Sequence, residues 1–462
     1  MTRFLLILLV FLTLTAPVWA ADEHPVIIRD TEIEDVLKTW TEPVIKAADL
    51  NPDAVNFILV QSADINAFVA GGPNIFLYSG LLEKTDNPAQ VIGVIAHELG
   101  HIRGGHLVRG HDAMDNASYE NMLGTILGIG AAIATGNGEV GAAVAAGTQS
   151  TALNKYLAFS RVQESSADQS ALDSLEKSGF SPAGMLDFLR KLESQELLPA
   201  TQQSEYVRTH PLTRDRVDAV AAGLARSNHK DAALPAAWSE QHARIIAKLT
   251  AFITPEQVVW NYPDNDKSIA ADYARAIAAY RQNRVEESLS RMDGLLTREA
   301  DNPYFLELKG QMLLDFGKVE EALPYYKKSV EIHTSAPLIR TAYAQALIES
   351  AGQNKHKDRL DEAITQLDRA RQDEPHSSKA CRLLATAWGR KGNEPMAWLY
   401  LAEEALLKGD KAYAKKQATA AMGQLEKGSR PWIRAQDILI YLEKGGDKDD
   451  DMIKPNKREK EN

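Results

Sequence analysis

The chain has 462 residues, of which 44% are hydrophobic and 25% are charged. This composition is typical of a globular protein with a sizeable core and excludes disorder throughout the chain. The length predicts about three structural units. The 63 acidic and 52 basic residues give a net charge of -11. That balance argues against a nucleic-acid-binding protein, because such proteins neutralise phosphates with a basic surface.

The first twenty residues have the pattern of a cleaved secretory signal. Arg3 supplies a short positive region, residues 4–15 are almost wholly apolar, and small or compact residues precede a cut after Ala20. The apolar run is shorter than the about 20 residues that a retained membrane anchor needs, so we expect cleavage. The only cysteine, Cys381, cannot form an internal disulfide. The exported chain must therefore depend on core burial or on a bound metal.

The region after the signal is predicted to combine helices with a small sheet. A helix is expected over residues 31–50, and turn residues separate β-rich runs, which predicts a small hairpin-containing sheet from segments 56–61, 66–69 and 75–78. Asn87 and Pro88 then have the pattern of an N-cap and a first helical residue. The helix that they begin carries the main motif of the chain.

A glycine-rich segment follows that helix. Seven glycines lie within residues 121–150, and no charge occurs over residues 122–138. Each half of the segment is shorter than a membrane-spanning helix, so we expect a buried or partly covered helical hairpin, with membrane contact that is peripheral at most. A more acidic helix is predicted over residues 156–178.

The second half of the chain is repetitive. It begins after a Pro/Ala-rich boundary at residues 232–237 and an isolated helical pattern at 240–253. Small residues recur there at steps of 34 and 41 in two series, which are Ala276, Gly310, Ala344 and Ala385, and Ser288, Ala322, Ala363 and Ala397. In each series, the one step of 41 is seven residues longer than the others. A loop insertion at 353–359 accounts for these seven residues in both series. A 34-residue period with small residues where paired helices cross predicts tetratricopeptide repeats.

His97, Glu98 and His101 form an H-E-x-x-H sequence. On a helix, residues four apart share a face, so both imidazoles can approach one metal ion. Glu98 is rotated by about 100° from His97 and can reach the open coordination position. This pattern suits a zinc ion that activates water.

A catalytic zinc ion normally has three protein ligands, so a third ligand must be found. The all-histidine arrangement requires a histidine where Leu107 stands, and His106 is one residue early, which rotates its side chain by about 100°. Glu164, on the acidic helix, is the better candidate. Asp168 lies four residues later on the same face, where it could accept a hydrogen bond from a ligand imidazole. Without the H-E-x-x-H sequence, these two carboxylates would be interpreted as part of a solvated acidic helix face.

The motifs and their order resemble those of the M48 peptidases. The resemblance rests on His97-Glu98-Leu99-Gly100-His101, on Arg161-Val-Gln-Glu164-Ser-Ser-Ala-Asp168, and on Ile65-Asn-Ala-Phe68 leading to Ser79-Gly-Leu-Leu82. With the export signal and the repeats, nearly the full length resembles the periplasmic β-barrel assembly-enhancing proteases of Gram-negative bacteria within that family. The implied fold is mainly α: a helical zincin-type metalloprotease domain with a small β-sheet, followed by an α-helical tetratricopeptide-repeat solenoid.

The resemblance also implies roles for individual residues. His97, His101 and Glu164 would bind one Zn²⁺ per subunit, and Glu98 would be the general base. Asp168 would support a ligand from behind. An extended substrate would lie along an edge strand formed by Asn66, Ala67 and Phe68.

His210, in the sequence Thr209-His210-Pro211, is expected near the zinc in proteins that this chain resembles. There it would either stabilise the oxyanion or occupy the fourth metal position and hold the enzyme inactive. The alternative is a loop histidine bonded to the backbone. His106 and His111 are expected to be structural or surface residues.

These patterns predict five segments. They are a signal peptide at 1–20, the M48 metalloprotease domain at 21–235, a linker helix at 236–264, the tetratricopeptide-repeat domain at 265–443 and a charged, disordered tail at 444–462.

The expected function is that of a zinc metalloendopeptidase in the periplasm. It would degrade misfolded or stalled outer-membrane proteins and assist their assembly, while the repeats dock these clients or the β-barrel assembly machinery. No nucleic-acid partner is expected. The alternative is a repeat-based chaperone or scaffold whose metal site is structural or normally silenced, because stacked helix pairs form a long concave binding surface whatever the first half does.

Overall fold

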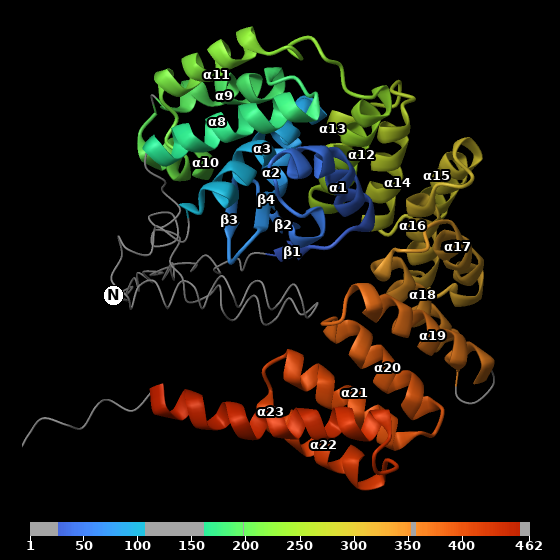
Figure 1. Ribbon diagram of the computed structural model, residues 1–462. Coiled ribbons are helices and arrows are strands. Elements are labelled where there is room, and N and C mark those ends of the chain that lie inside the picture. The colour runs from blue at the N-terminus through green and yellow to red at the C-terminus, as the bar shows by residue number, and fades with distance from the viewer. Residues whose placement is uncertain (1–25, 107–160, 197, 353–356, 453–462) are drawn as a thin grey trace, which may run out of the picture.

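The computed structural model describes residues 26–106, 161–196, 198–352 and 357–452 (Figure 1). The expected signal peptide, the glycine-rich segment at 121–150, His111 and the last ten residues of the expected tail lie outside the described residues.

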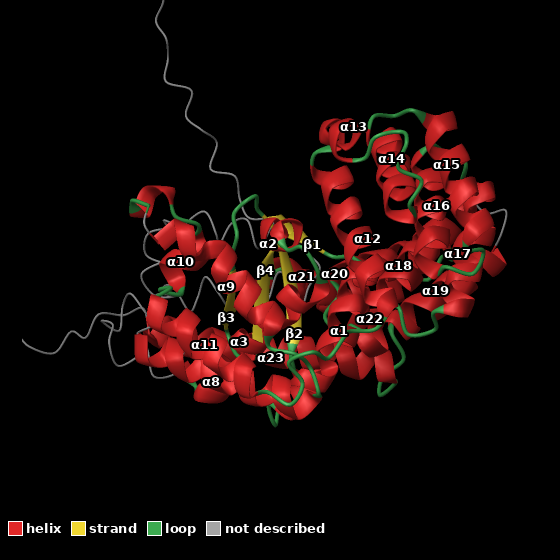
Figure 2. Cartoon of the chain, turned by 90° about the horizontal axis from the view of Figure 1, so that it is seen from above, coloured by secondary structure: helices red, strands yellow, loops and turns green. Residues whose placement is uncertain are grey.

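The first half of the described chain contains a small sheet and a set of helices. Its elements are β1 (Val26–Ile28), α1 (Thr31–Ala47), β2 (Asn56–Gln61), β3 (Ala67–Ala70), β4 (Asn74–Tyr78), α2 (Ser79–Lys84), α3 (Pro88–Gly104), α8 (Arg161–Ser178), α9 (Ala183–Glu196), α10 (Glu205–Thr209) and α11 (Arg214–Arg226). Figure 2 shows the strands near the middle of the molecule, with α8, α9 and α11 on one side and α12 and α14–α17 of the second half on the other.

The sheet has the strand order β1-β2-β4-β3. Strand β2 pairs in parallel with β4, and the β3–β4 hairpin turns at Gly71 and Gly72, whose φ angles of 63° and 100° lie in the region that favours glycine. The three predicted strands are confirmed as β2, β3 and β4. The fourth strand, β1, was not predicted, because three residues are too few to show an alternating pattern.

Helix α3 is the central element of this half. Asn87 Oδ1 accepts a hydrogen bond from the Gln90 backbone N–H and Pro88 begins the helix, which confirms the predicted start. Every residue over 90–101 is buried, because α1, α8, α9 and β3 all pack against this one helix. A polar motif on α3 is therefore held inside the protein rather than on its surface.

Close approach between α3 and its neighbours requires glycine. A Cβ added at Gly93 would lie 2.6 Å from the Cα of Met185 on α9, and one added at Gly100 would lie 2.6 Å from the carbonyl oxygen of Ala167 on α8. These contacts fix the distances from α3 to both helices.

The second half is an array of antiparallel helix pairs. Its helices are α12 (Ala236–Ile253), α13 (Val258–Asn261), α14 (Ile269–Arg281), α15 (Val285–Arg298), α16 (Pro303–Asp315), α17 (Val319–Ile332), α18 (Pro337–Ser350), α19 (Lys357–Asp373), α20 (Ser378–Arg390), α21 (Glu394–Leu407), α22 (Lys411–Gln424) and α23 (Arg430–Met452). The two series of small residues fall on alternate helices from α14 to α21, and all eight of these residues are buried. The repeat prediction is confirmed, and Figure 1 shows the array running from α14 beside the first half round to α21–α23 below it.

Helix α12 contributes to the cores of both halves. Ile245 and Leu249 are buried in the first core, whereas Ala247 and Ala251 are buried against α14 and its neighbours. The helix expected as a linker is thus a shared wall.

Polar contacts also join the two halves. Arg29 forms ion pairs with Glu34 and with Glu374 in the turn before α20. Asp35 Oδ2 accepts a hydrogen bond from the Tyr304 hydroxyl at 2.9 Å and lies 2.6 Å from His333 Nε2. Within the described ranges, no helix has both the length and the apolar character needed to cross a membrane.

Candidate metal centre

Helix α3 places His97 and His101 one turn apart, with their rings in an edge-to-face arrangement. The two Nε2 atoms are 3.0 Å apart, and both side chains are buried. The helix continues to Gly104 and ends at Gly105, which has a φ of 60°. The motif thus lies within a regular helix, as its spacing predicts.

Helix α8 brings two carboxylates to these imidazoles. Glu164 Oε2 lies 3.3 Å from His97 Nε2, and Glu164 Oε1 lies 3.3 Å from His101 Nε2. Asp168 Oδ1 lies 2.9 Å from His97 Nδ1, on the far side of that ring. Glu164 therefore faces the two histidines, while Asp168 supports one of them from behind.

His210 joins the cluster from the residue that follows α10. Its Nδ1 lies 3.2 Å from Glu164 Oε1, and its Nε2 lies 3.0 Å from the backbone oxygen of Ala67 on β3. Tyr206 stacks on the His210 ring at a centroid distance of 4.6 Å. The structure thus places His210 both beside the expected ligands and against the expected substrate strand.

The donor set fits a metal ion. One ligand atom from each of His97, His101, Glu164 and His210 lies within 4.8 Å of all the others, and all four residues are buried. Neither carboxylate oxygen of Glu98 has a hydrogen-bond partner among the described residues, although both are buried. Imidazole nitrogens and carboxylate oxygens that converge in a buried space are the ligands that zinc prefers.

Comparison with known families decides the class of the protein. Residues 31–223 match the family described as peptidase family M48, and residues 273–337 match the tetratricopeptide repeat. The chain therefore contains an M48 peptidase domain and tetratricopeptide repeats. The protein is a metallopeptidase.

Several known proteases are similar in sequence to this chain. The β-barrel assembly-enhancing protease of Escherichia coli O157:H7 is 26% identical over 413 residues, which cover 87% of this chain and 81% of that protein. The putative β-barrel assembly-enhancing protease of Vibrio cholerae is 22% identical over 79% of this chain and 75% of its own length. Metalloprotease LoiP of Escherichia coli K12 is 33% identical over 36% of this chain and 62% of its own length.

The M48 domain contains a buried arginine that the sequence did not single out. Arg216 on α11 donates hydrogen bonds from Nε and Nη2 to Asp168 at 2.7 and 2.9 Å, and its Nη1 lies 2.6 Å from Glu164 Oε2. Arg214, two residues earlier on the same helix, is exposed. Only the packing of α11 against α8 determines which of these two arginines faces inward.

His106 also contacts the centre of the M48 domain. It is buried, and its Nδ1 lies 3.0 Å from His101 Nδ1, behind the face that His101 presents to Glu164. The sequence excluded His106 from the expected ligand set because of its spacing. Its position is consistent with a structural role that orients His101.

The charges in the M48 centre are strongly coupled. Burial disfavours the charged form of His97, but the carboxylates of Glu164 and Asp168 outweigh this effect and raise its pKa to about 10. Burial lowers the pKa of His101 to about 3, so this ring is neutral and has a lone pair available for a metal. Burial also raises the pKa of Glu98 above its ordinary value.

The segment containing α10 covers one end of the edge strand of the M48 domain. The Tyr206 backbone N–H donates to the carbonyl oxygen of Ile65, and Asn66 Nδ2 donates to Glu205 Oε2 at 3.2 Å. The next residues along the strand, Ala67 and Phe68, are buried. Asn66 thus bonds to the α10 segment and Ala67 to His210, whereas Phe68 stacks on Phe76 of β4.

Proposed function

We propose that this M48 peptidase is a zinc-dependent endopeptidase of the periplasm. It degrades misfolded or stalled outer-membrane proteins and assists their assembly. The catalytic part of this proposal rests on the convergence of His97, His101 and Glu164 beside the buried Glu98, whose carboxylate has no hydrogen-bond partner among the described residues and lies 3.6 Å from His210 Nε2. The names of similar proteases and the export pattern of the sequence support the location and the clients.

In this proposal, His97, His101 and Glu164 hold one Zn²⁺ ion. Asp168 fixes the tautomer of His97 by accepting from its Nδ1, and Arg216 holds Asp168 in place. When bound, zinc lowers the pKa of water and polarises the scissile carbonyl.

Glu98 acts as the general base. Its carboxylate lies next to the ligands on α3, makes no hydrogen bond with the described residues, and has a pKa that burial raises. It is therefore ready to accept a proton from the attacking water and to deliver it to the leaving amine.

An extended client lies along β3 in this proposal. As the last strand in the sheet, β3 has one edge that pairs with no other strand of the described residues. Backbone pairing at such an edge depends little on side-chain sequence, which suits unfolded clients. The M48 domain, at 21–235, would cut such clients, and the repeats, at 265–443, would hold them or the β-barrel assembly machinery.

The Glu98→Gln variant tests the catalytic proposal. We expect it to retain one equivalent of zinc and to cleave a reduced, unfolded protein about 10²- to 10⁴-fold more slowly than wild type, because the proton acceptor is lost. Zinc content and cleavage are measured on the same samples. The exposed Glu193→Gln on α9 is the matched control and should behave like wild type.

If wild type with one equivalent of zinc never cleaves such a substrate, the endopeptidase proposal fails. The repeat-based chaperone or scaffold would then be the better account.

We propose further that His210 occupies an inhibitory fourth position. It lies 3.2 Å from Glu164 and 3.4 Å from His97, and it also contacts the Ala67 carbonyl that an extended substrate would need. A residue that blocks both the metal and the strand has to move before cleavage.

Replacing His210 by Ala distinguishes its two expected roles. We expect basal cleavage to increase several-fold, measured as the initial rate on the same unfolded substrate, with the exposed His376→Ala as the control. A residue that stabilises the oxyanion would give the opposite sign, with a fall of about 10²- to 10³-fold. A rate equal to wild type would remove His210 from the reaction altogether.

A further inference from the structure

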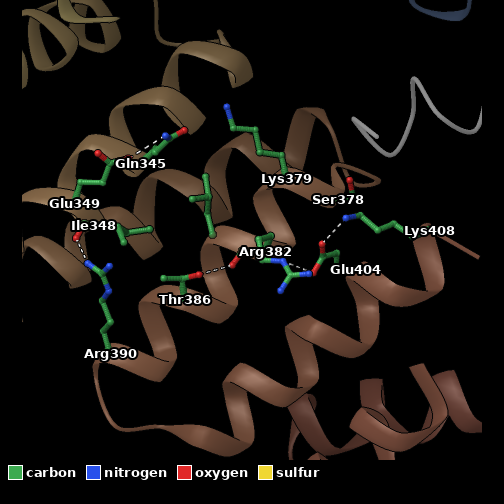
Figure 3. Close-up of a pocket in the computed structure, with 11 residues that line it drawn as sticks. Gln345, Ile348, Glu349, Ser378, Lys379, Arg382, Thr386, Arg390, Glu404 and Lys408 are labelled. Carbon is green, nitrogen blue, oxygen red and sulfur yellow. Dashed lines mark hydrogen bonds and ion pairs between the residues drawn. The ribbon is translucent and has the colours of Figure 1, made fainter. Parts of the chain in front are cut away.

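A cavity of about 480 Å³ lies between helices of the repeats (Figure 3). Its walls come from α18 and α20, the first helices of successive pairs, and from the end of α21. A cavity of this size lies in the range that accommodates small ligands or a few peptide side chains.

The walls of this cavity are basic, although the protein is acidic. Four cationic side chains and two carboxylates line it: Lys379, Arg382, Arg390, Lys408, Glu349 and Glu404. The local excess of positive charge contrasts with a net charge of -11 for the chain. Such a contrast points to an anionic occupant, because complementary charge steers and orients a partner.

Part of this positive charge is not neutralised by the protein. Glu404 is buried and lies 2.7 Å from Arg382 Nε and 2.9 Å from Lys408 Nζ, so two cations share one carboxylate. The Arg382 side chain remains 55% exposed, which leaves donors available to a ligand. Arg390 donates to the backbone oxygen of Ile348 rather than to a carboxylate.

The side chain of Lys379 makes no ion pair or hydrogen bond among the described residues, although its charge reaches the carboxyl group of Glu307 and partly offsets the burial that raises the pKa of that group. Figure 3 shows its side chain extending from α20 without a dashed contact, while Gln345 and Glu349 on α18 are bonded to each other. It is therefore available to pair with a carboxylate from outside.

The cavity also has apolar walls. Ile348 on α18 and Leu383 on α20 contribute to its lining. A site that combines apolar surface with cations suits a peptide better than a small inorganic anion, because the peptide buries side chains as well as charge.

We propose that this cavity binds an extended, acidic segment of a partner protein, with its carboxylates on Lys379 and Arg382. The wall that α20 contributes begins at Ser378, four residues after Glu374, which pairs with Arg29 of the M48 half. This proposal rests on the docking role proposed for the repeats and specifies the kind of segment that they bind. Peptide binding at this cavity does not require proteolysis by the M48 half.

The test uses the full-length Glu98→Gln protein, so that cleavage does not remove the probe. A fluorescein-labelled peptide of alternating Gly and Glu is titrated with this protein and followed by anisotropy. We expect saturable binding that weakens as salt is added, and no comparable binding of the matched Gly-Gln peptide.

Charge reversal locates the site. Lys379→Glu should weaken binding by roughly tenfold or more, and Lys379→Gln by less, because reversal adds repulsion to the loss of a contact. The control is Lys327→Glu on α17, an exposed lysine that does not line the cavity, and it should bind like the parent. Lys379 is exposed on its helix, so neither change should impair folding, which far-UV circular dichroism checks.

The proposal is overturned if the Gly-Glu peptide does not bind saturably, or if the Gly-Gln peptide binds equally well. It is also overturned if Lys379→Glu and Lys327→Glu weaken binding to the same extent. The test measures binding and not cleavage. Its result can therefore be interpreted even if the protein proves to have no peptidase activity.

Discussion

Among single residues, His242 shows how burial determines a charge state outside the metal centre. It lies on α12, is 5% exposed, and its Nε2 is 2.8 Å from the Thr85 hydroxyl oxygen. Burial lowers its pKa from 6.5 to about 4, so the ring is neutral in the folded protein at neutral pH.

Acid should therefore destabilise the protein through His242. Because the folded pKa is below the unfolded value, the unfolded chain binds a proton first as pH falls, and stability that is complete above pH 6.5 decreases towards pH 4. We expect wild type to lose roughly 3 kcal/mol more than His242→Gln over this range. Urea unfolding at a series of pH values, followed by circular dichroism, measures the difference. Parallel stability curves for the two proteins would contradict the prediction.

The residues of the metal centre differ in how far the sequence predicts them. His97, Glu98 and His101 follow from helical periodicity, and Glu164 and Asp168 follow from the family resemblance, since residue spacing alone leaves them as surface carboxylates. The inward position of Arg216 depends instead on how α11 packs on α8, which no local pattern encodes.

Among the elements, the contact between α3 and α8 determines the geometry of the centre. Gly100 lies between the two histidines on α3, and a Cβ there would meet both the backbone oxygen of Ala167 at 2.6 Å and its Cα at 2.9 Å. Backbone atoms cannot swing aside as a side chain can. The absence of a side chain at Gly100 therefore sets how closely Glu164 approaches the imidazoles.

Gly100→Ala should push α8 away from α3. We expect a loss of about 1–3 kcal/mol in stability from overpacking, and about 10- to 100-fold weaker zinc binding as the carboxylates move away from the imidazoles. Thermal unfolding and competition with a zinc chelator measure the two effects. The control, Gly294→Ala on α15, adds a methyl group where no atom lies within 4 Å and should stabilise by about 0.4–1 kcal/mol. Unchanged zinc affinity in Gly100→Ala would contradict the argument.

Local sequence patterns predict many of the elements but not all of their pairings. Asn87 and Pro88 mark the start of α3, and the 34-residue step locates the helix pairs of the repeats. The parallel pairing of β2 with β4 could not be predicted, because β3 lies between them in sequence and pairs with the other edge of β4.

For the whole molecule, the ion pair of Arg29 with Glu374 joins the start of the M48 half to the turn before α20. The chain separation between the two residues is large, and both side chains are partly exposed. Such a pair contributes little to global stability but restricts the motion of the segments that it joins.

Arg29→Gln should loosen α20 without unfolding the protein. We expect amide hydrogen exchange over the first turn of α20 to increase by up to about tenfold, and the unfolding free energy to change by less than about 1 kcal/mol. Hydrogen-exchange mass spectrometry measures the first effect and urea unfolding the second. Lys46→Gln, which breaks a pair with Glu42 inside α1, is the control and should leave α20 unchanged. Equal protection of α20 in all three proteins would show that the pair does not restrain it.

The shared wall formed by α12 has a consequence for how the chain can be divided. A fragment that stops at residue 235 lacks Ile245 and Leu249, so apolar side chains of the M48 half would face water. A fragment that starts at residue 265 lacks Ala247 and Ala251 and uncovers α14 in the same way. Each half therefore needs α12 for a complete surface, and any truncation intended to isolate one of them should keep this helix.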